Sequence, residues 1–228
     1  MKENKMGTME VRRLILTMSL PIMISMLVQA LYNIVDSMFV ARVSEAALAA
    51  VSLCYPIQMI MVAVACGTGV GINALLSRYL GEKKREKASQ VAMHGLFCAI
   101  CNWLVFAVIG LFFSEAFLRL FSDDVQIIMM GISYMQICTI CSFGVFVQST
   151  YERIMQSTGN TIYNMVIQGV GALINIILDP IFIFGLGPVP ALGTAGAAIA
   201  TVIGQIVAMF LGIIITQKKV REVQLSVR

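Results

Sequence analysis

Two aspartates stand inside apolar stretches of this 228-residue sequence, where a carboxylate has no water to solvate it. Asp36 follows Asn33 by three residues and Asp179 follows Asn175 by four, so each pair would share one face of a helix. An acid within a membrane span is expensive to place there and usually serves function. Carboxylate and amide oxygens suit a proton or a small hard cation, so these residues predict a site for H⁺ or Na⁺.

The composition indicates the kind of element that must position these acids. The chain is 59% hydrophobic, roughly 135 side chains, and only 12% charged, which is about half the usual charged fraction of a soluble domain. These values exclude a disordered chain, collagen, a coiled coil and a soluble enzyme. Since a spanning helix needs about 20 apolar residues, the sequence predicts an all-α, polytopic membrane protein with six helices.

The apolar segments divide the chain into three expected regions. Residues 1–13 form a polar head, residues 14–216 a six-helix transmembrane lobe, and residues 217–228 a basic tail. The six spans are expected at residues 14–41, 48–80, 88–113, 126–150, 162–186 and 194–216. Residues 151–161 are expected to form a polar loop that holds Glu152 and Arg153.

The basic residues predict an orientation. With six spans, 14 of the 16 Lys and Arg residues fall on the side of the two termini, and only Arg42 and Arg119 fall on the other. Cytoplasmic loops carry the excess of Lys and Arg, so we expect both termini to be cytoplasmic in a bacterial plasma membrane. Lys and Arg at span ends account for the net charge of +4, and we expect no nucleic-acid partner.

This topology predicts that the two acids lie at similar depth. Asp36 is 23 residues beyond Arg13, and Asp179 is 19 residues beyond Asn160. At about 1.5 Å per residue, these separations are roughly 35 Å and 29 Å from the inner ends of two spans that run in the same direction. Pro180 follows Asp179 and frees a backbone carbonyl, which is tolerated where a helix lines a cavity.

Other features favour packing over chemistry. The spacings Gly67–Gly71 and Gly196–Ala200–Gly204 predict close helix approach. The six cysteines, two pairs of them in C-x-x-C spacing, have no accompanying histidine or loop, so we interpret them as packing residues and expect no metal beyond Na⁺ at the acids. The sequence has no nucleophile–base–acid set and no phosphate loop, and we expect neither an enzyme nor a cofactor.

Several segments, spread over nearly the whole chain, resemble the multidrug and toxic compound extrusion (MATE) transporters. The segments are Pro21, LYNIVD at 31–36, the stretch 67–78 with Gly81, QSTGNT at 156–161, NIILDPIF at 175–182 and GTAGAAIAT at 193–201. At Tyr163-Asn164 the sequence departs from the Pro-Met of many relatives.

The resemblance implies one lobe of a twelve-helix exporter that is driven by Na⁺ or H⁺ and expels cationic or amphipathic small molecules. It implies a cation site in this lobe, centred on Asp36, Asn175 and Asp179, with Tyr32 and Thr201 contributing. It also implies that the helix holding Pro21 bends there, and the position of Pro180 itself predicts a break or bend in the helix holding Asp179.

Two alternatives keep this fold. The chain is half the length that the family normally has, so it could be a truncated or half-transporter subunit that needs a second lobe or a self-dimer, and the tail resembles an inter-lobe linker. A lipid-linked oligosaccharide flippase of the wider superfamily would predict a more basic cavity, whereas the expected spans hold no Lys or Arg apart from Arg78, which belongs with the charged turn that follows it.

Overall fold

The computed structural model describes residues 9–186, 189–220 and 223, and all regular elements in these residues are α-helices. The helices are α2 (Val11–Ala41), α3 (Glu45–Gly81), α4 (Arg85–Arg119), α5 (Val125–Ile140), α6 (Phe143–Ser157), α7 (Thr161–Phe184) and α8 (Thr194–Lys219). Five of them are long and apolar enough to cross a membrane, and the bent pair α5–α6 is so when its two helices are taken together. The predicted all-α membrane bundle is therefore confirmed.

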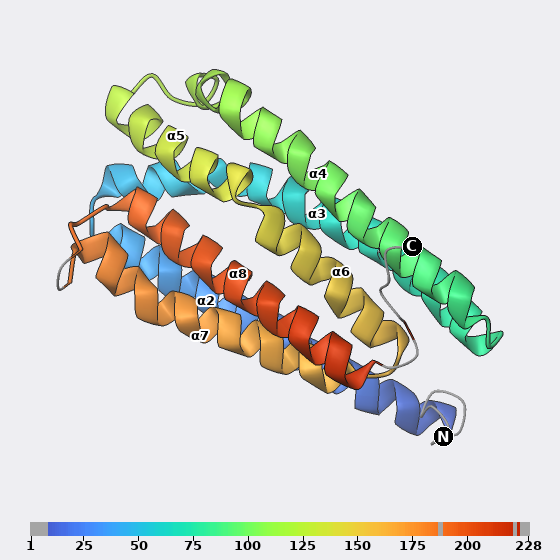
Figure 1. Cartoon of the computed structure of the whole chain (residues 1–228). Helices are drawn as coiled ribbons and strands as arrows, with labels where there is room; N and C mark the ends of the chain where they lie inside the picture. The colour runs from blue at the N-terminus through green and yellow to red at the C-terminus, as the bar shows by residue number, and fades with distance from the viewer. Residues whose placement is uncertain (1–8, 187–188, 221–222, 224–228) are drawn as a thin grey trace.

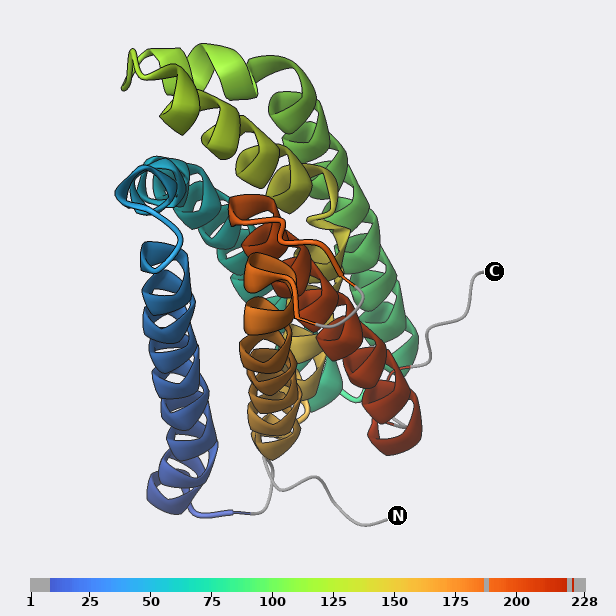
Figure 2. The same cartoon turned by 90° about the vertical axis from the view of Figure 1, so that its left-hand side faces the viewer.

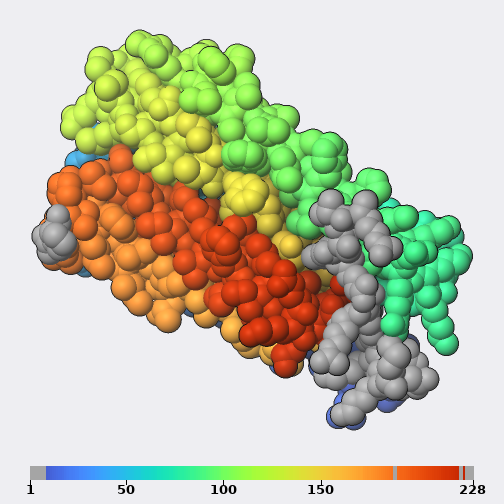
Figure 3. Space-filling model, viewed as in Figure 1, coloured from blue at the N-terminus to red at the C-terminus, as the bar shows by residue number. Residues whose placement is uncertain are grey.

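The helices form an elongated bundle with α8 near its centre (Figure 1). Helix α7 packs along α8, α2 packs along α7, and α6 lies between α3 and α8. Helix α2 touches α3 only slightly and stands apart from α4, α5 and α6 (Figure 2). In the space-filling view, α8 covers the middle of one face beside α7 and α6 (Figure 3). This arrangement leaves room for a cavity between α2 and α3.

Glycines set the close approach of α7 and α8. A Cβ on Gly196 would collide with the carbonyl oxygen of Phe182, and one on Gly204 would lie 2.8 Å from the carbonyl oxygen of Gly171. The backbones of the two helices therefore meet where the sequence predicted close packing. The Gly67–Gly71 pair behaves differently, because a Cβ on either residue would meet no atom within 4 Å. That part of the prediction is wrong.

The cysteines are less packed than expected. All six are free, and Cys98, Cys101 and Cys141 are exposed on the apolar outside of the bundle. Cys54 and Cys138 are buried, and Cys66 is half-buried. A small sulfur side chain is compatible with lipid as well as with a core, so apolar surroundings in the sequence did not distinguish the two.

The fourth span is broken. Helices α5 and α6 meet at an angle of 43°, and the Trp103 side chain of α4 donates from Nε1 to the carbonyl oxygen of Ile140 at 2.7 Å. Beyond the break, α6 continues to Ser157, seven residues past the predicted end of this span at Thr150. The predicted polar loop at 151–161 is therefore too long: residues 151–157 are helical and 158–160 connect α6 to α7, because Glu152, Arg153 and Gln156 are polar residues that line a cavity.

One end of the bundle carries most of the described basic residues. The start of α2, the end of α8 and the α3–α4 and α6–α7 turns lie at this end (Figure 1). At the α3–α4 turn, Glu82 accepts from Lys84 at 2.7 Å and from Arg78 at 3.0 Å, and these bonds hold the pKa of Glu82 below its usual range. The predicted head and tail residues Lys2, Lys5, Arg221 and Arg228 lie outside the described residues.

Candidate functional site

Asp179 is fully buried on α7, one turn beyond Asn175 and opposite Thr201 of α8. The amide of Asn175, oriented to satisfy its neighbours, donates to Asp179 Oδ2 at 3.0 Å. Its oxygen then accepts from the backbone N–H and the hydroxyl of Thr201, at 3.0 and 3.1 Å. Asn175 therefore links the buried carboxylate to α8.

Helix α2 supplies the second acid. Asp36 is 7% exposed, and its Oδ1 has no hydrogen-bond partner among the described residues. It lies close enough to Asp179 for the two charges to interact. One turn earlier, the Tyr32 hydroxyl is hydrogen-bonded to Thr201 and is within electrostatic range of both carboxylates. Buried polar atoms are normally paired, so an orphaned carboxylate oxygen beside a second acid marks a place where a proton or cation would be stabilised.

The structure thus brings together the five predicted site residues from α2, α7 and α8: Tyr32, Asp36, Asn175, Asp179 and Thr201. Asn33, which the spacing paired with Asp36, is not hydrogen-bonded to it in the described part of the chain and lines the cavity. The spacing of three residues places Asn33 and Asp36 on one side of α2, but it does not fix the direction of the Asn33 side chain. The neighbouring helices determine that direction.

The two prolines lie within continuous helices. Helix α2 runs without a break through Pro21, whose carbonyl oxygen accepts from the Ser25 hydroxyl at 2.8 Å. Pro180 follows Asp179 within α7, which ends four residues later at Phe184, before the left-handed Gly185. In this structure, the predicted break at Pro180 does not interrupt α7. Each proline still leaves a backbone carbonyl without its helical donor.

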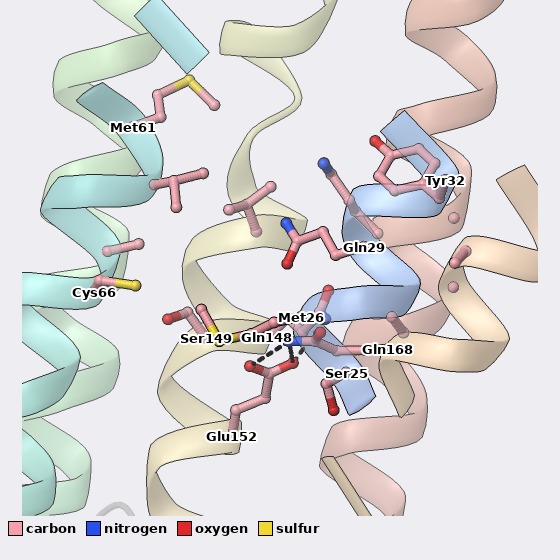
Figure 4. Close-up of a pocket in the computed structure, with 18 of the residues that line it drawn as sticks. Ser25, Met26, Gln29, Tyr32, Met61, Cys66, Gln148, Ser149, Glu152 and Gln168 are labelled. Carbon is pink, nitrogen blue, oxygen red and sulfur yellow. Dashed lines mark hydrogen bonds between the residues drawn. The ribbon is translucent and has the colours of Figure 1, made fainter. Parts of the chain in front are cut away.

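A cavity of about 390 Å³ opens beside these residues, between α2, α3, α6, α7 and α8 (Figure 4). Tyr32, Asn175 and Thr201 line it, whereas Asp36 and Asp179 lie behind its wall. Its lining mixes amides and thioethers with small residues, including Met26, Gln29, Gln58, Met59 and Met61. Flexible methionines and amides adapt to ligands of different shape.

Glu152 of α6 is a further acid in this cavity that the sequence placed in a loop. Its side chain is 8% exposed and accepts from Gln148 at 3.0 Å and from Gln168 at 3.1 Å on each carboxylate oxygen (Figure 4). The signal that could have revealed it is the helical spacing of Gln148, Glu152 and Gln156, which continues the polar face of the span past its expected end.

Arg153 also lines the cavity, next to Glu152 in the sequence. It donates to Gln156 Oε1 at 2.8 Å and to the Cys66 sulfur at 3.3 Å. The expectation that the spans hold no Lys or Arg is therefore wrong, because α6 carries this guanidinium inside the bundle. Among the described residues, no group of three or more His, Cys, Asp and Glu side chains is arranged to hold a metal ion.

Comparison with known proteins gives consistent relatives. A family model described as MatE matches residues 21–181. The chain is 30% identical over 199 residues to the FAD transporter of Shewanella oneidensis, covering 87% of this chain and 44% of that protein. It is 30% identical over 213 residues to the multidrug export protein MepA of Staphylococcus haemolyticus, covering 92% of this chain and 46% of that protein.

A solved structure described as the outward-facing conformation of a multidrug resistance MATE family transporter of the MOP superfamily is similar throughout. Its TM-score is 0.91 at 28% identity, and the match covers all of this chain and 50% of that chain. The chain spans less than half the length of the two curated relatives. The family match, the relatives and the fold agree, and this chain belongs to the MatE family, whose members are transporters and not enzymes.

Proposed function

We propose that this chain is the cation-binding lobe of an antiporter that exports drug-like small molecules across the plasma membrane, driven by inward Na⁺ or H⁺ flow. One observation carries the proposal: Asp36, whose buried Oδ1 has no partner, is within electrostatic range of the fully buried Asp179, and both lie behind the cavity wall. Tyr32, Asn175 and Thr201 border both the acids and the cavity, so they are the residues through which a change at one would reach the other.

The coupling follows from the charges. Two buried carboxylates close to each other repel, and a proton or Na⁺ between them removes that repulsion. The ion therefore favours the conformation in which Asp36 on α2 lies closest to Asp179 on α7. A ligand shifts a conformational equilibrium only by its differential affinity for the two states, and this site supplies such a difference.

Helix α2 is the element that would move. It packs mainly on α7 and has little contact with α3, and Pro21 leaves one of its turns without a hydrogen bond. We place the bend at Pro21, with a lesser adjustment of α7 at Pro180. A bend of α2 would displace Met26, Gln29 and Tyr32, which line the cavity, and so change its shape for an amphipathic or cationic substrate.

A second lobe completes the proposal. The relatives are more than twice as long as the matched part of this chain, so we expect the cavity to be closed by another lobe or by a second copy, with residues 217–228 leading toward it. The oligosaccharide flippase is less well supported, because Arg153 is the one basic residue among the described residues that line the cavity, and a flippase predicts a more basic wall.

The test is gradient-driven efflux of a fluorescent cationic dye from proteoliposomes that contain the chain, alone and with a second lobe. We expect Asp36→Asn and Asp179→Asn each to abolish efflux driven by a Na⁺ or pH gradient, because a neutral amide cannot exchange a proton or balance a cation. The matched control is Asp123→Asn, which alters an exposed loop acid and should leave efflux intact.

Gradient-driven efflux that is undiminished in either site variant would refute the assignment of the cation site. Full efflux by the chain alone, at a concentration where it is monomeric, would instead refute the requirement for a second lobe. Dye efflux that is insensitive to both Na⁺ and pH would refute ion coupling.

A further inference from the structure

The inner part of the cavity holds a cation without an acidic partner. Arg153 lies on α6, five positions from the C-cap residue Thr158, and lines the cavity. None of the ion pairs found among the described residues includes it. A guanidinium within a bundle is costly unless it is paired or faces a water-filled cavity, so its lack of a carboxylate partner calls for an explanation.

The neighbouring acid does not provide that partner. The two oxygens of Glu152 are taken by Gln148 and Gln168, at 3.0 and 3.1 Å. The two side chains leave adjacent positions of one helix and project toward different neighbours, Glu152 toward α7 and Arg153 toward α3. Glu152 and Arg153 therefore form no direct ion pair, and their charges interact only at a distance.

The fold holds the guanidinium in place through α3. Its stem crosses Gly69, where an added Cβ would lie 2.8 Å from Arg153 Cγ and 3.0 Å from Nε. This close crossing buries Nε without a partner and directs the two terminal nitrogens toward Gln156 and Cys66. Each terminal nitrogen carries two N–H groups and makes one of these bonds, so donors remain for a ligand.

We propose that Arg153, Gln156 and Cys66 form an anion subsite that binds the oxyanion, a carboxylate or phosphate, of an amphipathic molecule in the cavity. Guanidinium donors match the geometry of such oxyanions, and the methionines and small residues of the cavity accept an apolar body. This subsite deepens the proposed function, on which it rests, by extending the substrates from cations to molecules that carry a negative group.

Cys66 makes the subsite measurable, because its sulfur lies 3.3 Å from Arg153 Nη2. We would use the full chain with the other five cysteines replaced by alanine, and measure the rate at which N-ethylmaleimide labels Cys66. Hexyl phosphate, hexyltrimethylammonium and hexanol share one alkyl chain and differ in charge. We expect hexyl phosphate to slow labelling at concentrations where the other two do not.

Arg153→Gln should weaken the protection by hexyl phosphate about tenfold, the effect of losing one charge-assisted contact. Arg153→Lys keeps the charge and should retain most of the protection. The matched control is Arg119→Gln, which alters an exposed arginine at the far end of α4 and should retain all of it. Equal protection by hexanol in the parent chain, or protection that survives Arg153→Gln, would overturn the proposal.

Two further arms separate the sources of the oxyanion. Inorganic phosphate tests a free anion, and vesicles of phosphatidylcholine with and without phosphatidylglycerol test a lipid headgroup. Protection by added phosphatidylglycerol, with none by hexyl phosphate, would show that Arg153 anchors to lipid and would overturn the substrate subsite. The labelling rate requires no transport and no gradient, so this test can fail or succeed independently of the Asp36 and Asp179 experiment.

Discussion

At the scale of single residues, the charges of this lobe fall into two separate places. Asp36 and Asp179 lie toward one end of α2 and α7, behind the cavity wall. Glu152 and Arg153 lie toward the other end, and Gln168, which holds Glu152, precedes Asp179 by 11 residues on α7. At about 1.5 Å per residue, that is roughly 16 Å along the helix. The proposed coupling-ion site and the proposed ligand subsite are therefore far enough apart to use different residues.

The hydrogen bonds around Glu152 predict a measurable coupling free energy between Glu152 and Gln168. Gln168 makes two of its three hydrogen bonds, so Gln168→Leu should lower the free energy of unfolding by about 1.5 to 3 kcal/mol, as for bonds to a charged group. In a chain that carries Glu152→Gln, the same change should cost distinctly less, since no carboxylate is left underbonded. Thermal unfolding in detergent, applied to the double-mutant cycle, measures the difference.

The matched control for this cycle is Gln205→Leu. Gln205 lines the same cavity and makes no hydrogen bond among the described side chains, so its replacement should leave the midpoint of unfolding nearly unchanged. Equal effects of Gln168→Leu in both backgrounds would mean that Gln168 stabilises the lobe by packing alone and not through Glu152.

At the scale of helices, the contact of α7 with α8 holds Asn175, which bonds Asp179, against Thr201. This contact depends on glycine, because the Phe182 carbonyl occupies the position of a Cβ on Gly196. The fourth span is bent instead of closely packed. Helices α5 and α6 diverge by 43°, and Trp103 donates a hydrogen bond to the Ile140 carbonyl oxygen at the break. One pair of elements is thereby packed closely, and the other is bent so that α6 presents polar side chains to the cavity.

Two glycine variants distinguish a packing contact from a spacing coincidence. Gly196→Ala should lower the free energy of unfolding by about 1 to 3 kcal/mol, because the helices must separate to fit the methyl group. Gly67→Ala should be neutral or stabilising by up to about 1 kcal/mol, since it meets open space and improves helix propensity. Thermal unfolding in detergent compares them directly, and a more stable Gly196→Ala chain would contradict the close contact.

At the scale of the whole molecule, apolar side chains cover the outside. Phe112 and Leu120, which are 75% and 80% exposed, are examples on and just after α4. In water such surfaces would drive aggregation, whereas lipid solvates them, so the bundle needs a membrane to be stable. The short loops at one end and the basic turns at the other provide the asymmetry that orients it.

The proposed orientation predicts the accessibility of single cysteines. In a chain without its native cysteines, Arg85→Cys lies at the basic α3–α4 turn and Asp123→Cys at the α4–α5 turn, both exposed. A membrane-impermeant maleimide added to intact cells should label Asp123→Cys but label Arg85→Cys only after permeabilisation. The reverse pattern would place the termini outside, and labelling of both in intact cells would refute the six-span topology.

The sequence by itself determined the class of molecule and the location of its main acids. Apolar length and charge placement report the cost of moving each residue from water to lipid, and this cost depends little on neighbours. The same cost made Asp36 and Asp179 conspicuous, and their depth could be calculated from helical rise alone. The all-α bundle was predictable for this reason, whereas the family was predictable from the segments that resemble MATE transporters.

Only the tertiary structure decided which side chains meet. In the sequence, Glu152 and Arg153 resemble loop residues, because a charged side chain is costly to place in lipid. Both residues avoid that cost by lining a cavity, and the cavity exists only when five helices pack. In the same way, Gly196 meets a neighbouring backbone and Gly67 meets none, although both stand in small-residue spacings. Spacing fixes the face of a helix, but what that face contacts depends on the position of the other helices.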